Sequence, residues 1–191
     1  PEGYVRRQVE GWTRRYTHAA TDDTGLEDVL AWLDQNQPSE SGTALIHNDY
    51  KYDNVVLGPE HRIVRAVLDW ELATVGDPLM DLGSTLGYWV EPGDPAPLRA
   101  VALSPTWWPG NPTREGVVEA YQERTGLEVG APVFYTAYGF VKLAVIAQQI
   151  YKRWTLGHAK DPRFSGLIEV VRACTGLAAS AIEADRISDL G

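Results

Sequence analysis

The chain has 191 residues, of which 44% are hydrophobic and 23% charged, a composition that supports one domain with a sizeable core and excludes a disordered or fibrous protein. Its net charge of −9, with no basic face to offset it, argues against a nucleic-acid partner, whereas a cationic small molecule is compatible with it. The single cysteine, Cys174, lies in an apolar helical pattern and cannot form an internal disulfide, which predicts a buried thiol and a cytoplasmic setting.

Two amphipathic helices are predicted at the start of the chain. In residues 1–20, apolar side chains recur at helical spacing on one face, and four arginines lie mostly on the other, where we expect solvent. Thr24 and Glu27 have the spacing of a capping box and are followed by leucines and a valine at helical spacing. A second helix is therefore predicted here, and residues 36–42 form its polar connection to the next segment.

The stretch 44–82 carries the residues that indicate chemistry. His47, Asp49 and Asn54 stand in the order H-x-D-x-x-x-x-N, and Asp69 follows the next apolar runs. A kinase must hold a hydroxyl nucleophile in line with the γ-phosphate of ATP and neutralise the phosphate charge, usually with Mg²⁺. Asp49 fits the group that accepts the hydroxyl proton. Asn54 and Asp69 offer the metal a neutral and an anionic oxygen, respectively.

Two further residues of this loop receive supporting roles. Lys51 could reach the transferring phosphate as a point charge, and His47 is better placed to brace the loop than to exchange protons. Structural readings compete with each assignment, because Asp69 could be a turn residue at a strand end and Asn54 could bond its own backbone. The residues taken together, rather than any one of them, favour phosphoryl transfer.

Three short apolar runs predict strands around the loop, at residues 44–46, 55–57 and 63–68. Each is rich in β-branched or other apolar residues and is bounded by turn formers. The second and third runs predict a hairpin with residues 58–62 at its turn. Such a hairpin would bring the two candidate metal ligands to the same open end.

This stretch resembles the catalytic core of the aminoglycoside phosphotransferase and choline kinase family, small-molecule kinases with a protein-kinase-like fold. It is most similar to the branch that includes the kinase-like domain associated with acyl-CoA dehydrogenases, where the patterns H-G-D-Y-K-x-D-N-V and L-D-W-E-L-x-T-x-G-D-P are familiar. Here residues 47–55 read H-N-D-Y-K-Y-D-N-V and residues 68–78 read L-D-W-E-L-A-T-V-G-D-P. The departure is Asn48, where the family usually carries Gly, and it changes no group assigned to chemistry.

The resemblance implies an α+β, mostly helical fold, the C-terminal lobe of a protein-kinase-like fold with a small β-hairpin at the active site. It covers nearly all of that lobe, residues 1–191, and implies ATP and Mg²⁺ as cofactors. Such kinases also have a smaller N-terminal lobe with a glycine-rich loop and a strand lysine, and no such lobe precedes Pro1. We therefore expect the chain alone to show little or no kinase activity.

Two aspartates after the second motif are predicted to support the structure. Asp77 precedes Pro78 and a helical pattern over residues 79–90, which is the position of a good N-cap, so support is favoured over metal binding. Asp81, one turn further on, either bonds back to the catalytic loop or is a solvated first-turn carboxylate.

A loop rich in proline and glycine, residues 92–112, follows that helix. Its adjacent tryptophans either cover hydrophobic core, the more common case, or line a substrate pocket. In the resembling kinases this region lies near the phosphate acceptor. The candidates for substrate contact are therefore Tyr88, Trp89, Trp107 and Trp108.

Three helices are predicted in the remainder, over residues 113–124 with Gly126 closing it, 132–154 and 162–184. The second is the most apolar, but Lys142 and two glutamines interrupt it, which favours a buried core helix over a membrane span. No signal peptide, membrane partner or internal repeat is predicted, and no oligomeric state is assigned.

Several functions stay open at this point. The partner would be a small-molecule hydroxyl acceptor, either aminoglycoside-like or hydroxyacyl-CoA-like, and the lack of an obvious acidic cluster near the C-terminus counts against an antibiotic. A non-catalytic pseudokinase lobe that binds a partner is one alternative. A metal-dependent hydrolase is another, although the other histidines, His18, His61 and His158, stand at spacings that do not favour a metal site.

Overall fold

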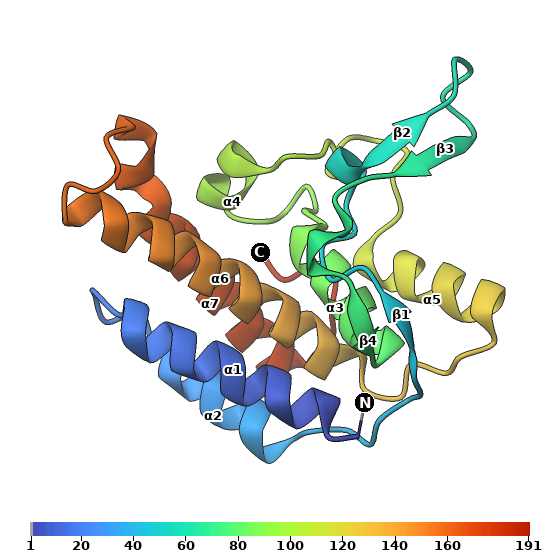
Figure 1. Cartoon of the computed structure of the whole chain (residues 1–191), viewed down its shortest axis with the longest axis horizontal. Helices are drawn as coiled ribbons and strands as arrows, with labels where there is room; N and C mark the ends of the chain where they lie inside the picture. Colours follow the sequence, from blue (N-terminus) through green and yellow to red (C-terminus); the bar gives the residue numbers. More distant parts are fainter. Residues whose placement is uncertain (1) are drawn as a thin grey trace.

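The computed structural model describes residues 2–191 and shows a group of long helices from which a β-hairpin projects (Figure 1). The helices are α1 (Tyr4–Ala19), α2 (Leu26–Gln35), α3 (Pro78–Tyr88), α4 (Ala96–Val101), α5 (Arg114–Thr125), α6 (Pro132–Thr155) and α7 (Leu167–Ala184). The strands are β1 (Ala44–Ile46), β2 (Val55–Leu57), β3 (Val64–Val67) and β4 (Thr74–Gly76). Short 3₁₀ turns are η1 (Tyr52–Asn54), η2 (Trp70–Leu72) and η3 (Pro162–Gly166). The predicted α+β, mostly helical architecture is confirmed.

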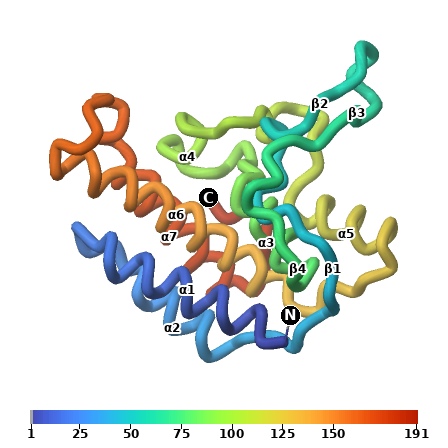
Figure 2. The backbone as a smooth tube through the Cα atoms, viewed as in Figure 1, coloured from blue at the N-terminus to red at the C-terminus, as the bar shows by residue number. Residues whose placement is uncertain are grey.

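Helix α6 is the centre of the hydrophobic core. It packs along α7 and α3, while α1 and α2 lie side by side against another part of its surface (Figure 2). Its apolar side chains point in nearly all directions, and Phe134, Tyr138, Phe140 and Val141 are almost completely buried. A helix that is apolar all round must be enclosed by protein, which explains its central place.

Three glycines let α3 and α6 cross with their backbones in contact. A Cβ atom on Gly139 of α6 would lie 2.1 Å from the carbonyl oxygen of Gly83, and one on Gly87 would lie 2.4 Å from the carbonyl oxygen of Gly139. No larger residue fits such distances. The crossing therefore fixes the position of α6 relative to α3.

The strands form two antiparallel pairs. β1 pairs with β4, with Leu45 opposite Val75, and β2 pairs with β3, with Val55 opposite Val67. The β2–β3 hairpin, with its turn after Leu57, is confirmed as predicted. β4 was not predicted, because its three residues are recognisable only through their pairing with β1, a strand that ends 28 positions before β4 begins.

The helix predictions are confirmed with small differences at the ends. α3 ends at Tyr88 rather than at residue 90, and the last predicted helix begins as the 3₁₀ turn η3. Asp77 caps α3 by accepting a 2.8 Å bond from the Leu79 amide, and its carboxylate also accepts bonds from the amide and hydroxyl of Ser41, so its structural role is confirmed. Helix α4 was not predicted within the loop over residues 92–112.

The predicted capping box at Thr24 is wrong. The N-cap of α2 is Gly25, whose φ of 72° suits glycine, and no side chain caps this helix end. Glu27 instead accepts a 2.6 Å hydrogen bond from the hydroxyl of Tyr16 on α1. A contact between the two helices therefore replaces the local one.

Two helical stretches, Pro132–Thr155 and Pro162–Ala184, are long and apolar enough to cross a membrane by length and composition alone. In the folded chain, 78% and 50% of their most apolar windows are buried by other parts of the protein. The core helix of a soluble protein meets the same criterion.

Candidate active site

The loop after β1 is held by one carboxylate on α3. Asp81 accepts a 2.8 Å hydrogen bond from the amide of His47 with one oxygen and a 2.7 Å bond from the amide of Asn48 with the other. Of the two alternatives for Asp81, the bond back to the catalytic loop is therefore confirmed.

Asn48 has a left-handed backbone conformation, with φ of 64°. Glycine adopts this conformation without strain and asparagine tolerates it better than most residues, which explains how Asn can stand where the resembling loops carry Gly. Its side-chain amide donates to the carbonyl of Leu72 at 3.0 Å, and its side-chain oxygen accepts from the hydroxyl of Tyr4 at 3.2 Å. The substitution thus adds contacts to α1 and to the segment after β3.

Both ring nitrogens of His47 are occupied by backbone groups. Nε2 lies 2.7 Å from the carbonyl oxygen of Leu68, and Nδ1 lies 3.2 Å from the amide nitrogen of Asp49. Because a carbonyl only accepts and an amide only donates, the ring is neutral and carries its proton on Nε2. The ring is 4% exposed and packs 4.8 Å from the Trp70 ring, so it can brace the loop but has no nitrogen left for proton exchange.

Asp49 presents a carboxylate that is held on one side and open on the other. It forms an ion pair with Lys51 and accepts a 3.0 Å hydrogen bond from the side-chain amide of Asn54. The Lys51 ammonium lies 4.8 Å from the centre of the Tyr88 ring. Burial and the nearby Asp49 carboxylate raise the pKa of Tyr88, so this hydroxyl stays protonated beside the loop.

Asn54 and Asp69 flank the same end of the β2–β3 hairpin, where the amide of Leu68 donates to the carbonyl of Asn54 at 2.7 Å. The Asn54 amide nitrogen is used by Asp49, but its side-chain oxygen has no partner within residues 2–191. The Asp69 side chain likewise makes no hydrogen bond or ion pair with the described part of the chain. An amide oxygen and a carboxylate left unpaired at one edge suit a hard cation such as Mg²⁺.

A cluster of three or more His, Cys, Asp or Glu side chains able to hold a metal ion does not occur among residues 2–191. Two protein ligands fit a kinase site, because Mg²⁺ usually keeps waters and binds the substrate phosphates. The described residues therefore contain no ligand cluster that would support the alternative of a metal-dependent hydrolase.

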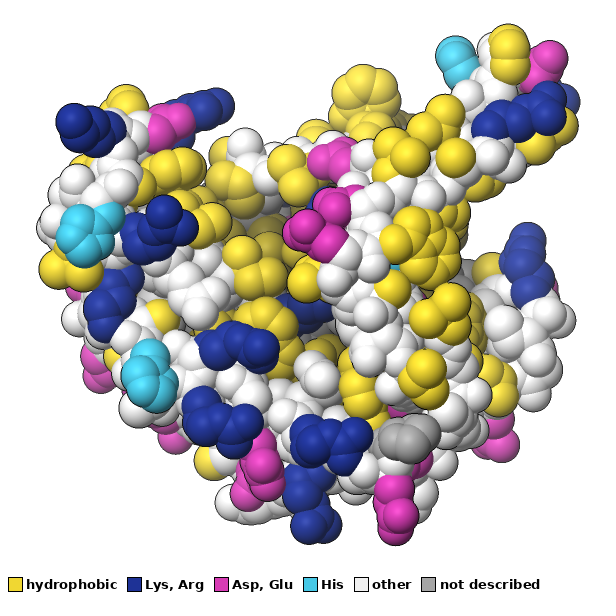
Figure 3. Space-filling view, in the orientation of Figure 1, with side chains coloured by type: hydrophobic (Ala, Val, Ile, Leu, Met, Phe, Trp, Pro, Cys, Tyr) yellow, Lys and Arg dark blue, Asp and Glu magenta, His cyan; other side chains and the backbone are white. Residues whose placement is uncertain are grey.

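A cavity of about 450 Å³ opens beside Asp49, between α1, α6 and the catalytic loop. Arg15 and Lys142 supply basic groups to its wall, and Asp49 is its single carboxylate. Basic side chains also gather over α1 on this face of the molecule (Figure 3). The remaining lining residues are Gln8, Trp12, Asn48, Leu72, Thr74, Tyr88, Ile146 and Gln149.

The four aromatic candidates for substrate contact lie in different places. Tyr88 lines the cavity beside Asp49, whereas Trp89 lines a neighbouring groove between β1, α3 and α5. Trp107 packs against the core and Trp108 is 61% exposed, and neither lines the cavity. The structure therefore brings two of the four to the loop that carries Asp49: Tyr88 beside the carboxylate, and Trp89, whose ring centre lies 5.4 Å from that of Tyr52.

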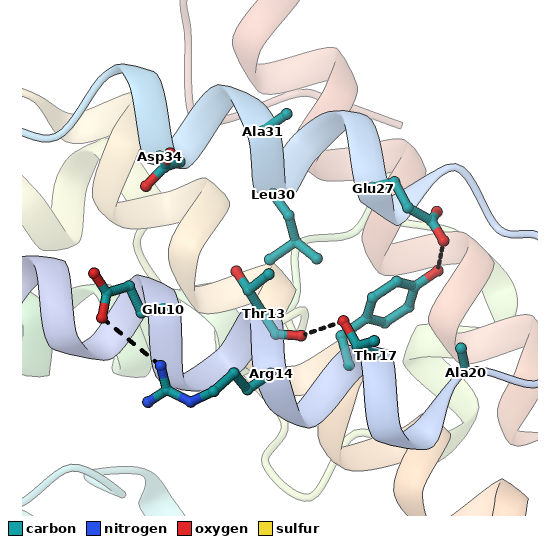
Figure 4. A pocket seen from close by; sticks show the side chains of 10 residues that line it. Glu10, Thr13, Arg14, Thr17, Ala20, Glu27, Leu30, Ala31 and Asp34 are labelled. Atoms are coloured by element: carbon teal, nitrogen blue, oxygen red, sulfur yellow. Dashed lines mark hydrogen bonds and ion pairs between the residues drawn. The ribbon is translucent and has the colours of Figure 1, made fainter.

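A larger, open groove of about 660 Å³ lies between α1 and α2, away from the catalytic loop (Figure 4). Its polar residues pair with each other, as in the 3.7 Å ion pair between Arg14 and Glu10 and the bond from Tyr16 to Glu27. No residue of the predicted catalytic loop lines this groove.

Lys142 is the residue of this region that sequence reasoning missed. Its ammonium group donates to the carbonyl oxygen of Asn48 and, at 3.0 Å, to the hydroxyl of Ser84, although the sequence suggested only an interruption of an apolar helix. The signal was present, because a lysine rarely enters a core without polar partners.

Comparisons with known proteins find a matching family and several relatives. The model of the phosphotransferase enzyme family matches residues 1–116. Acyl-CoA dehydrogenase family member 10 of Mus musculus is 37% identical over 165 residues, which cover 83% of this chain and 15% of the relative. Family member 11 of Homo sapiens is 35% identical over 160 residues, which cover 82% and 20%.

Among solved structures, a protein from Ralstonia eutropha that is assigned as an aminoglycoside phosphotransferase matches with a TM-score of 0.81 and 30% identity. The match covers 96% of this chain and 56% of that one. The chain spans no more than 20% of the length of the two curated relatives named above. The predicted resemblance and the kinase-like fold are confirmed.

Proposed function

The chain belongs to the phosphotransferase enzyme family, and from this premise we propose that it carries the catalytic loop of a small-molecule kinase that transfers the γ-phosphate of ATP to a hydroxyl group. One observation carries the proposal. The Asp49 carboxylate lies beside a cavity, and the unpaired oxygens of Asn54 and Asp69 flank one end of the adjacent hairpin.

In this mechanism the acceptor hydroxyl enters the cavity and donates its hydrogen bond to Asp49. Its oxygen forms a bond to the γ-phosphorus, the bond from that phosphorus to the bridging oxygen breaks, and ADP leaves. The hydroxyl proton passes to the Asp49 carboxylate. Asn54 and Asp69 would hold Mg²⁺, which neutralises phosphate charge when bound. Lys51 offers a positive charge next to Asp49, and His47 keeps the loop in place.

The charge of the cavity supports one of the two acceptor classes. An aminoglycoside carries several ammonium groups, and a site for it needs carboxylates, whereas this cavity has Arg15 and Lys142 against the single carboxylate of Asp49. We therefore favour an anionic acceptor of the hydroxyacyl-CoA-like class. The names of the relatives, which refer to acyl-CoA dehydrogenases, agree with this choice.

The proposal extends to the setting of the reaction. Residues 1–191 would act as the catalytic-loop lobe, with further nucleotide contacts from a glycine-rich loop and a strand lysine, so we expect little turnover by this chain alone. We propose a cytoplasmic enzyme whose partner is a small molecule, without a nucleic-acid or membrane partner.

Calorimetric titration of Mg·ATP into this chain and into the full-length natural protein tests the proposal. We expect binding by the full-length protein that disappears when magnesium is withheld, followed by ADP release with hydroxyacyl-CoA acceptors and not with aminoglycosides. Absence of nucleotide binding by the full-length protein would overturn the kinase assignment in favour of a pseudokinase lobe that binds a partner. ADP release with aminoglycosides alone would reverse the choice of acceptor.

A further inference from the structure

Lys142 lies in the middle of α6 and is 5% exposed. Burying an ammonium group costs free energy, and an ion pair usually offsets that cost. No carboxylate of residues 2–191 lies within ion-pair distance of this ammonium, and its two hydrogen-bond partners, Asn48 and Ser84, are neutral. We therefore attribute the presence of this buried cation to its two hydrogen bonds, to the Asn48 carbonyl and the Ser84 hydroxyl.

One of those contacts reaches the peptide group that precedes Asp49. The amide of Asn48 is bound by Asp81 on α3, and its carbonyl is bound by Lys142 on α6. The residue between these two bonds has the unusual left-handed conformation. Two helices thus fix the backbone from both sides at the position where the chain turns toward the Asp49 carboxylate.

The anchor of Lys142 is rigid. Gly139, three residues earlier on α6, touches the backbone of α3 at Gly83, and Ser84, the next residue of α3, binds the Lys142 ammonium. Because backbone contact leaves no room for sliding, the distance from α6 to the catalytic loop is set by this crossing.

We propose that Lys142 is a positioning residue for phosphoryl transfer, which holds the Asn48 carbonyl and thereby sets the direction of the Asp49 carboxylate. The catalytic part of this inference rests on the proposed function. The structural part, that Lys142 orders the loop, does not depend on it.

Because Lys142 can lose its charge, its hold on the Asn48 carbonyl is sensitive to pH. Burial lowers the pKa of Lys142 to about 8, the carboxylates of Asp49 and Asp81 oppose this shift, and the cations Lys51 and Arg15 add to it. A neutral amine gives a weaker hydrogen bond to a carbonyl than an ammonium does. The order of the catalytic loop is therefore expected to decrease as the pH rises above about 8.

Amide hydrogen exchange of this chain tests the structural part. In Lys142→Met we expect roughly ten- to hundredfold faster exchange at the amides of residues 47–49, the range of one lost charge-assisted hydrogen bond, with α7 unchanged. Lys142→Arg should restore part of the protection. The matched control is Lys152→Met, because Lys152 also extends from α6 to a backbone carbonyl, that of His18, far from the loop.

Unchanged exchange at residues 47–49 in Lys142→Met would overturn the proposal. An equal increase across α7 would also overturn it, because Lys142 would then support the core in general. The unsubstituted chain gives an independent test if the variant does not fold. Its loop protection, corrected for intrinsic exchange rates, should decrease relative to that of α7 from about pH 7 to about pH 9. Constant loop protection would contradict the account.

Kinetics of the full-length protein test the catalytic part. With Mg·ATP and an acceptor that it phosphorylates, Lys142→Met should lower kcat at least about tenfold with little change in KM for ATP, because positioning acts on the chemical step. The alkaline decrease of kcat near about pH 8 should be absent in Lys142→Arg. An unchanged kcat in Lys142→Met would refute the positioning role. Absence of turnover by the unsubstituted protein would refute the proposed function instead and leave the exchange result standing.

Discussion

The carboxylate of Asp81 accepts a 2.7 Å hydrogen bond from the backbone amide of Asn48 and so ties helix α3 to the catalytic loop. The two residues are 33 positions apart in the chain. The position of Asp49 is therefore determined by tertiary contacts as well as by the local sequence of its loop.

Replacing Asp81 by Asn should loosen the loop. The substitution puts an amide donor where one of two backbone amides needs an acceptor, so one hydrogen bond is lost and a buried donor is left unpaired. We expect roughly tenfold or faster hydrogen exchange at the amides of residues 47–48 and a comparable loss of phosphoryl transfer. Asp22→Asn, at an exposed position between α1 and α2, is the matched control and should change stability by no more than about 0.5 kcal/mol. Wild-type exchange in Asp81→Asn would show that the loop does not depend on this carboxylate.

Replacing Gly139 by Ala should destabilise the fold by about 1–3 kcal/mol or more, because the added methyl group would lie 2.1 Å from the Gly83 carbonyl oxygen and force α3 and α6 apart. Gly176→Ala on α7 is the control, since a Cβ there meets no atom within 4 Å. That change should be neutral or stabilising by about 0.5–1 kcal/mol. Urea unfolding of both variants measures the difference, and equal stabilities would contradict the backbone contact.

Arg114 forms a buried ionic network with Glu91 and Asp94. Arg114→Met would leave two buried carboxylates without their cation, and we expect a loss of about 3–5 kcal/mol in the free energy of unfolding. Arg172→Met is the matched control, because Arg172 pairs with Glu169 on the surface and should contribute less than about 1 kcal/mol. Similar losses in the two variants would show that burial of the network does not matter.

The lowered pKa of Lys142 predicts a specific dependence of stability on pH. Its pKa falls from 10.5 in the unfolded chain to about 8 in the folded protein, so between these values the unfolded chain binds the extra proton. The contribution of Lys142 to stability is therefore fully present above pH 10.5 and is lost as the pH falls through about 8. The difference in unfolding free energy between the unsubstituted chain and Lys142→Met should rise over this interval. A difference independent of pH would contradict the shift.

The features predicted correctly from the sequence are those with local signals. Thr113 at the start and Gly126 at the end of α5 were identified in advance, and both are confirmed as caps. The hairpin was found in the same way, because its two apolar runs and its turn are adjacent in the chain. The motif over residues 47–55 was likewise recognised from neighbouring positions, and the roles assigned to its residues stay predictions.

The features missed depend on distant partners. β4 is a strand because it pairs with β1. The hydrogen-bond partners of Lys142 lie on α3 and on the loop after β1, which the crossing of α3 and α6 at Gly139 brings close to it. The capping box failed for the same reason, since Glu27 found a partner on α1 instead of the start of its own helix. In each case the sequence near the residue does not identify the distant partner that it contacts.

Phosphoryl transfer by Asp49→Asn and Asp69→Asn variants of the full-length natural protein, with Mg·ATP and an acceptor that releases ADP, tests the central claim most directly. The account predicts that Asp49→Asn abolishes transfer and leaves Mg·ATP binding nearly intact, because the carboxylate acts on the hydroxyl and not on the nucleotide. It predicts that Asp69→Asn weakens binding only in the presence of magnesium. Unimpaired turnover in both variants would contradict the assignment of the site.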